Sequence, residues 1–151
     1  MAIGTISLEG AKELIAKLER FTPTVGKQIM RTALRAGAQP ILAQARANAP
    51  GARIKRSLKV RAGKSSKAGQ NAVSVLVSTR AGDFKGKEFF AGFLEYGTKE
   101  RTQKKFKKKA RRTGKVSPRE FMKRAFESRQ SEAERIIAEE LKAGIEAELV
   151  K

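Results

Sequence analysis

The last third of the chain carries an apolar stripe at helical spacing, which constrains the fold more than any other feature of the sequence. Between residues 118 and 149 its apolar members lie four or seven residues apart, apart from one adjacent pair: Phe121, Ala125, Phe126, Ala133, Ile137, Leu141, Ile145 and Leu149. Such spacing places them along one side of an α-helix. Ser117, followed by Pro118 and then by Glu120, is typical of a helix N-terminus. We predict a helix from 118 to about 149, too long for a small sheet to cover, so that part of it would pack against a neighbouring copy.

A second long helix is predicted in the first third of the chain. Thr22 followed by Pro23 is typical of a helix start, and apolar residues continue at helical spacing to about Asn48. Gly37 and Pro40 lie inside this segment. Because proline removes a backbone donor and clashes with the preceding turn, we expect a kink there.

The remaining segments predict short elements. Residues 54–61 and 72–79 alternate apolar and polar side chains, as half-buried antiparallel strands do. Residues 62–71 between them are rich in Gly, Ser and Lys and predict a flexible loop. Residues 2–8 predict a further short strand or an ordered arm, and residues 11–21 a short helix.

An aromatic segment, residues 89–96, fits either a helix or a strand, because periodicity cannot decide for so short a run. We expect Phe93 and Tyr96 to point into the core, together with Phe121, Phe126 and Ile137. The patterns combine into one α+β domain over the whole chain. Its small antiparallel sheet of three to four strands packs against two long helices, 24–48 and 118–149, and a long basic loop, 99–116, is flexible.

Charge is distributed very unevenly. The chain carries 34 basic and 15 acidic residues, a net charge of +19. Residues 51–67 hold seven basic and no acidic residues, and residues 99–117 hold ten basic residues and one acidic. These two short segments therefore account for +16 of the net charge, a field that attracts polyanions and repels copies of the same chain.

The composition argues against catalysis. The chain has no histidine and no cysteine, so zinc sites built from Cys and His, thiolate chemistry and the commonest general base are excluded. Asp83 is the only aspartate, and no acid–base constellation is recognisable; Glu95 is better explained as a buried acceptor of backbone hydrogen bonds. No cofactor and no metal are expected. With no apolar run long enough for a membrane span and no signal peptide, we expect a protein made in the cytoplasm.

The basic run allows three interpretations. It could contact nucleic-acid phosphates through clustered cations, order against an acidic neighbouring subunit, or only keep the protein in solution. We rank the first two slightly above the third, because well-formed elements flank the run. The candidate contact residues are Arg101, Lys104, Lys105, Lys107, Lys108, Lys109, Arg111 and Arg112. Sequence-specific recognition is not supported, since no known DNA- or RNA-reading motif is present.

The order of elements carries a resemblance. A helix ending in Ala45-Arg46-Ala47-Asn48-Ala49-Pro50 precedes a basic strand pair, which is followed by Glu95-Tyr96-Gly97-Thr98 and then by Phe121 and Ala125. This arrangement resembles the minor tail components of long-tailed DNA bacteriophages, also called neck or tail-completion proteins. The resemblance spans nearly the whole chain. The chain departs from the family pattern in the turn after Pro50, in the place of Pro118, and in the length of the basic insert.

The resemblance implies a structural protein of the virion, not an enzyme, that helps to join tail to capsid. It implies a homo-oligomeric ring, six-fold by preference, contacting neighbouring neck, tail-terminator or tail-tube proteins, with phage DNA as a further contact. It implies assembly in the host cytoplasm and no membrane partner. Two rival functions are a non-specific DNA- or RNA-binding protein outside any particle, and a nuclease or other enzyme that uses carboxylates alone.

Overall fold

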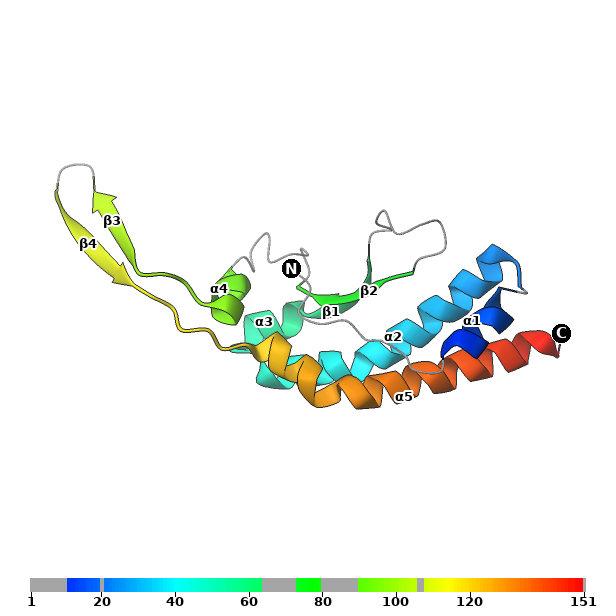
Figure 1. The fold of residues 1–151 in the computed structure, drawn as a ribbon. Helices are drawn as coiled ribbons and strands as arrows, with labels where there is room; N and C mark the ends of the chain where they lie inside the picture. Colours follow the sequence, from blue (N-terminus) through cyan, green and yellow to red (C-terminus); the bar gives the residue numbers. More distant parts are fainter. Residues whose placement is uncertain (1–10, 20, 64–72, 80–89, 106–107, 151) are drawn as a thin grey trace.

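The computed structural model describes residues 11–19, 21–63, 73–79, 90–105 and 108–150, and it shows an elongated molecule (Figure 1). Its helices are α1 (Ala11–Leu18), α2 (Pro23–Asn48), α3 (Ala52–Ser57), α4 (Phe90–Tyr96) and α5 (Phe121–Leu149). Its strands are β1 (Lys59–Ala62), β2 (Val75–Ser78), β3 (Arg101–Lys105) and β4 (Lys108–Gly114). None of the described helices is long and apolar enough to cross a membrane.

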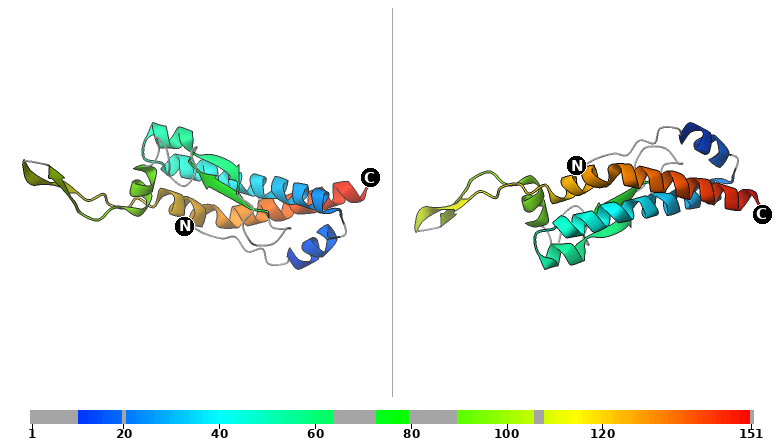
Figure 2. Two further views of the ribbon diagram at one scale, coloured as in Figure 1. Left: turned by 90° about the horizontal axis from the view of Figure 1, so that it is seen from above. Right: turned by 90° about the horizontal axis from the view of Figure 1, so that it is seen from below.

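The two long helices, α2 and α5, lie side by side and antiparallel and form the body of the molecule (Figures 1 and 2). Glycines allow them to approach closely. A Cβ on Gly37 would collide with the Ile137 side chain and lie 2.9 Å from the Ala133 carbonyl oxygen. A Cβ on Gly144 would lie 2.8 Å from Cγ2 of Ile29. The helical periodicity therefore predicted both helices correctly, and the glycines set the distance between them.

Two hydrophobic clusters line this helix pair. One surrounds the start of α5 and brings together buried residues from four helices and the segment before β1: Leu42, Ala45, Ile54, Leu58, Ala91, Phe121, Met122 and Ala125. The other lies under α1 and consists of Leu18, Ala33, Ile137, Leu141 and Ile145. The prediction of inward-facing Phe121 and Ile137 is confirmed, and Phe126 is half-buried.

The aromatic segment is a helix, but its orientation differs from the prediction. In α4 the buried positions are Ala91 and Glu95, one helical turn apart. Phe93 and Tyr96 therefore fall on the other side and are 38% and 50% exposed. The expectation that both aromatics point into the core was wrong, because the helix buries an alanine and its carboxylate instead.

The sheet is smaller than predicted. Strands β1 and β2 pair antiparallel, with Val60 opposite Val77, and both valines pack against the first hydrophobic cluster. Residues 54–57 belong to α3, because Ile54 and Ser57 turn inward at helical spacing, so only the end of the predicted 54–61 strand is extended. The described residues contain two separate two-stranded sheets instead of one sheet of three to four strands. The predicted strand at 2–8 and nearly all of the predicted loop at 62–71 lie outside the described residues.

The second sheet stands where the long basic loop was predicted. Strands β3 and β4 pair antiparallel with each other, and we call this pair the basic hairpin. The basic hairpin extends away from the body beyond α4, at the end of the molecule opposite to the C-terminus of α5 (Figures 1 and 2). Backbone pairing thus gives regular structure to a segment whose composition predicted a loop.

Candidate functional site

Glu95 joins α4 to the start of α5. Its side chain is 1% exposed and lies at the N-terminus of α5, where unpaired backbone N–H groups favour an anion. Oε2 accepts a hydrogen bond from the Met122 N–H at 2.9 Å, and Oε1 accepts one from the Lys123 N–H at 3.0 Å. The predicted structural role of Glu95 is therefore confirmed.

The start of α5 differs from the prediction in its capping. The helix begins at Phe121, and Glu120 occupies the N-cap in the left-handed conformation without a capping side-chain hydrogen bond of its own. Ser117 and Pro118 lie outside the helix. The capping-box pattern at 117–120 was therefore misleading, because a carboxylate from another element takes over the capping role.

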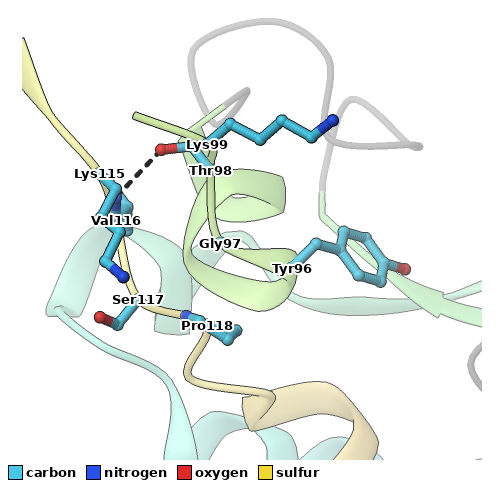
Figure 3. Close-up of a pocket in the computed structure, with 8 residues that line it drawn as sticks. All are labelled: Tyr96, Gly97, Thr98, Lys99, Lys115, Val116, Ser117 and Pro118. Carbon is cyan, nitrogen blue, oxygen red and sulfur yellow. Dashed lines mark hydrogen bonds between the residues drawn. The ribbon is translucent and has the colours of Figure 1, made fainter. Parts of the chain in front are cut away.

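Residues 94–98 and 116–120 are tied together by backbone hydrogen bonds. The Thr98 N–H donates to the Val116 carbonyl at 2.9 Å, and the Val116 N–H donates to Oγ1 of Thr98 at 3.0 Å (Figure 3). The Arg119 N–H donates to the Leu94 carbonyl at 2.7 Å, and the Glu120 N–H donates to the Glu95 carbonyl at 3.3 Å. We call residues 94–98 and 116–123 the hairpin junction, since the basic hairpin leaves the body between them.

Gly97 is required by this close approach. Its φ of +73° lies in the left-handed region, and a Cβ there would stand 2.9 Å from both the Val116 carbonyl oxygen and Cδ of Pro118. Phe121 and Ala125, the other residues of the sequence motif, are both fully buried and belong to the first hydrophobic cluster. Asn48 reinforces this arrangement by donating from Nδ2 to the Phe121 carbonyl at 3.4 Å.

A shallow hollow of about 350 Å³ lies at the hairpin junction (Figure 3). It is lined by Tyr96, Gly97, Thr98, Lys99, Lys115, Val116, Ser117 and Pro118. Burial and the neighbouring Glu95 carboxylate, in that order, raise the pKa of Tyr96 above its ordinary value of 10.0. The lining residues include no acid–base pair, and the described residues contain no cluster of three His, Cys, Asp or Glu that could hold a metal.

The predicted cationic contact residues lie on the basic hairpin. Arg101, Lys104 and Lys105 are on β3; Lys108, Lys109, Arg111 and Arg112 are on β4; Lys107 lies outside the described residues. The backbone register sets Lys105 opposite Lys108. Like charges placed opposite each other across a strand pair repel, so an anionic partner would stabilise this hairpin.

Sequence reasoning did not predict a second hollow, of about 330 Å³, between α2 and the last turns of α5. It is lined by Val25, Gln28, Ile29, Thr32, Glu140, Gly144 and Glu148, and we call it the acidic groove. The spacing of residues 140, 144 and 148 places them on one side of a helix, which was the available signal.

Comparison with known proteins places the chain beside a family of bacteriophage proteins. The sequence model of the family described as "Bacteriophage HK97-gp10, putative tail-component" matches residues 12–97. This range runs from α1 to the Glu95-Tyr96-Gly97 part of the hairpin junction and does not include the basic hairpin or α5. No curated protein and no solved structure matches the chain.

Proposed function

The chain belongs to the HK97-gp10-like family of bacteriophage tail components, and from this premise we propose that it is a structural assembly protein of the head–tail junction. In this proposal it forms a homo-oligomeric ring, six-fold by preference, in the neck or at the completed end of the tail. It assembles in the host cytoplasm, becomes part of the virion, and contacts neighbouring neck, tail-terminator or tail-tube proteins. It performs no catalysis and needs no cofactor.

The observation that supports this proposal beyond family membership is the hairpin junction. The buried Glu95 carboxylate and four hydrogen bonds between residues 94–98 and 116–120 fasten the basic hairpin to the first turn of α5. A hairpin held in this way projects from the helical body in a fixed direction (Figure 1). Such a projection suits a subunit that reaches a neighbour in an assembly.

A complementation experiment tests the proposed function. Host cells infected with phage that lacks this gene should yield capsids and tails that remain unjoined in electron micrographs, and the wild-type gene should restore joined particles. We expect that replacing Lys104, Lys105, Lys107, Lys108 and Lys109 by Gln preserves the melting temperature but impairs joining.

The matched control removes the same number of cations from the body. Arg35, Arg53, Lys55, Arg56 and Lys59 are exposed, and replacing all five by Gln lowers the net charge equally. This control should still join heads to tails. Normal particles made without the gene would refute the assignment to the head–tail junction, and full complementation by the hairpin variant would leave the hairpin with no role beyond solubility.

A non-specific DNA-binding protein outside any particle is the second candidate, which the ten cations within residues 99–117 favour. Phosphate contacts release counterions, so the affinity of any basic surface for DNA falls with salt. A dedicated DNA-binding protein should retain duplex binding at physiological salt, whereas an assembly protein with a basic hairpin should bind only at low salt. Binding that persists, combined with normal particles from the gene deletion, would select this second function.

A further inference from the structure

The basic hairpin forms a sheet of its own in the described part of the chain. Its two strands hydrogen-bond to each other, and in the described part of the chain neither strand belongs to any other sheet. Cationic residues occupy seven of its twelve strand positions, and the register sets Lys105 opposite Lys108. This concentration of like charge disfavours the isolated hairpin and is relieved by an anionic partner.

An anionic surface lies at the other end of the molecule. Residues 131–149, the last two thirds of α5, contain six glutamates and only two basic residues, although the whole chain is strongly basic. One of these glutamates, Glu139, forms an ion pair with Arg135 within the same helix at 2.7 Å. Two others, Glu140 and Glu148, line the acidic groove.

The acidic groove suits a lysine or arginine side chain. Val25 and Ile29 of α2 offer apolar surface for a methylene stem, and Ile29 packs on Gly144 between the two glutamates. Long cationic side chains commonly place their stems on apolar surface while the charged end meets a carboxylate or water. The groove therefore combines the shape and the charge that a cationic strand requires.

The hairpin cannot reach the groove of its own chain. The groove lies near the C-terminal end of α5, whose 29 residues span about 43 Å, and the hairpin extends from the opposite end (Figures 1 and 2). A contact between them must join two copies. Because the two surfaces differ, the contact is head-to-tail, and repeated contacts of this kind close into a ring when the rotation between copies allows it.

We propose that the basic hairpin of one copy docks in the acidic groove of a second copy, as the repeated contact of the proposed assembly. This inference rests on the proposed function and adds the two surfaces that meet. The net charge of +19 opposes association in most orientations, whereas the segregated charges favour this one. A DNA partner for the hairpin would leave the acidic groove unexplained, since the groove repels phosphate.

The first test measures self-association of the full-length chain by sedimentation velocity at low and at physiological salt. Glu140→Lys combined with Glu148→Lys should weaken association at least about tenfold, or about 1.4 kcal/mol, because attraction at each carboxylate becomes repulsion. Replacing Lys104, Lys105, Lys108 and Lys109 by Glu should weaken it as much. The matched controls are Glu127→Lys combined with Glu146→Lys, at two exposed positions of α5 that do not line the groove, and reversal of Arg53, Lys55, Arg56 and Lys59; both should associate as the wild type does. Melting curves establish that each variant is folded.

Mixing the two defective variants gives the sharper result. For this mixture both surfaces are neutralised with Gln instead of reversed, because a groove that carries Lys would attract a hairpin that carries Glu. The neutral groove variant keeps an intact hairpin and the neutral hairpin variant keeps an intact groove, so one good contact can form between them and no further copy can add. We expect a one-to-one complex from two chains that are each monomeric alone. A symmetric interface, in which the same surface meets itself, cannot produce this behaviour.

Three outcomes would overturn the proposal: a wild-type chain that stays monomeric at low salt, variants that associate normally, or a mixture that forms no complex. A hairpin variant that loses DNA binding but still self-associates would instead assign the hairpin to DNA. These results are independent of the particle experiment. If the gene deletion leaves heads and tails unjoined but the variants associate normally, the docking contact is refuted and the proposed function is retained. If the gene deletion gives normal particles but the variants lose association, the proposed function alone is refuted.

Discussion

Replacing Glu95 by Gln tests whether the capping of α5 holds the hairpin junction together. The substitution keeps the size of the side chain, but it exchanges one carboxylate oxygen for an NH₂ group. Since both oxygens accept backbone N–H groups, at 2.9 Å from Met122 and 3.0 Å from Lys123, one of these two donors must then face another donor. The variant also removes the negative charge from the positive end of the helix dipole.

The expected cost follows from these contacts. Hydrogen bonds to charged groups contribute about 1.5–3 kcal/mol each, and an unsatisfied buried donor costs about 1–3 kcal/mol. Part of this loss is recovered through the remaining oxygen, so we expect a destabilisation of about 2–4 kcal/mol. In a chain of this size 1 kcal/mol lowers the melting temperature by about 2–4 °C, which gives a decrease of about 4–16 °C.

The assay is a thermal melt combined with amide hydrogen exchange at Met122 and Lys123. The matched control is Glu127→Gln, which removes the same charge from an exposed position six residues into α5 and should change the melting temperature little. Exchange at the two capped amides should accelerate in Glu95→Gln and stay unchanged in the control. Equal melting temperatures for the two variants, with unchanged protection of both amides, would refute the capping role of Glu95.

Three further predictions concern the core, the helix contact and the only tyrosine. Phe121→Ala should lower the free energy of unfolding by about 3–5 kcal/mol, because Phe121 is fully buried, whereas Phe93→Ala should lower it much less in the isolated chain. Chemical denaturation measures both values, and equal losses would contradict the described core. Gly37→Ala should destabilise by about 1–3 kcal/mol, because its Cβ collides with Ile137, and the combination with Ile137→Val should recover part of that loss in the same assay. The phenolate absorbance of Tyr96 should titrate above pH 10.0. In folded Glu95→Gln protein the pKa of Tyr96 should fall towards that value, because a neighbouring negative charge that opposes ionisation is lost. An unchanged midpoint would show that Glu95 does not act on Tyr96.

The sequence predicted the parts of the fold that depend on long periodic patterns. The apolar spacing identified α2 and α5 nearly to their ends, and the absence of a partner acid near Glu95 led correctly to a structural role for it. Short elements were harder to predict, because competing contacts decide them. In α4, burial of Ala91 and Glu95 overrides the apparent preference of Phe93 and Tyr96 for the core.

The basic hairpin and the acidic groove show two other limits of sequence reasoning. A strand pair in which charged residues follow one another has no apolar alternation, so its composition predicted a loop although the two strands pair antiparallel, with two irregularities in their register. The groove depends on how α2 lies against α5, which brings Val25 and Ile29 next to Glu140 and Glu148. No local sequence pattern predicts how closely these two helices approach each other.

The close contacts at Gly37 and Gly144 also determine how far apart the two ends of the helix pair lie. Ile137 occupies the space above Gly37, and Ile29 occupies the space above Gly144, so each helix contributes one isoleucine and one glycine. Sliding α5 along α2 by one turn, about 5.4 Å, would press both isoleucines against positions that carry side chains. The helix pair therefore has one register, and the separation between the hairpin junction and the acidic groove is the same in every copy. A closed ring needs this constancy, because a small variation in subunit length would accumulate around the circle and leave the last contact unmade.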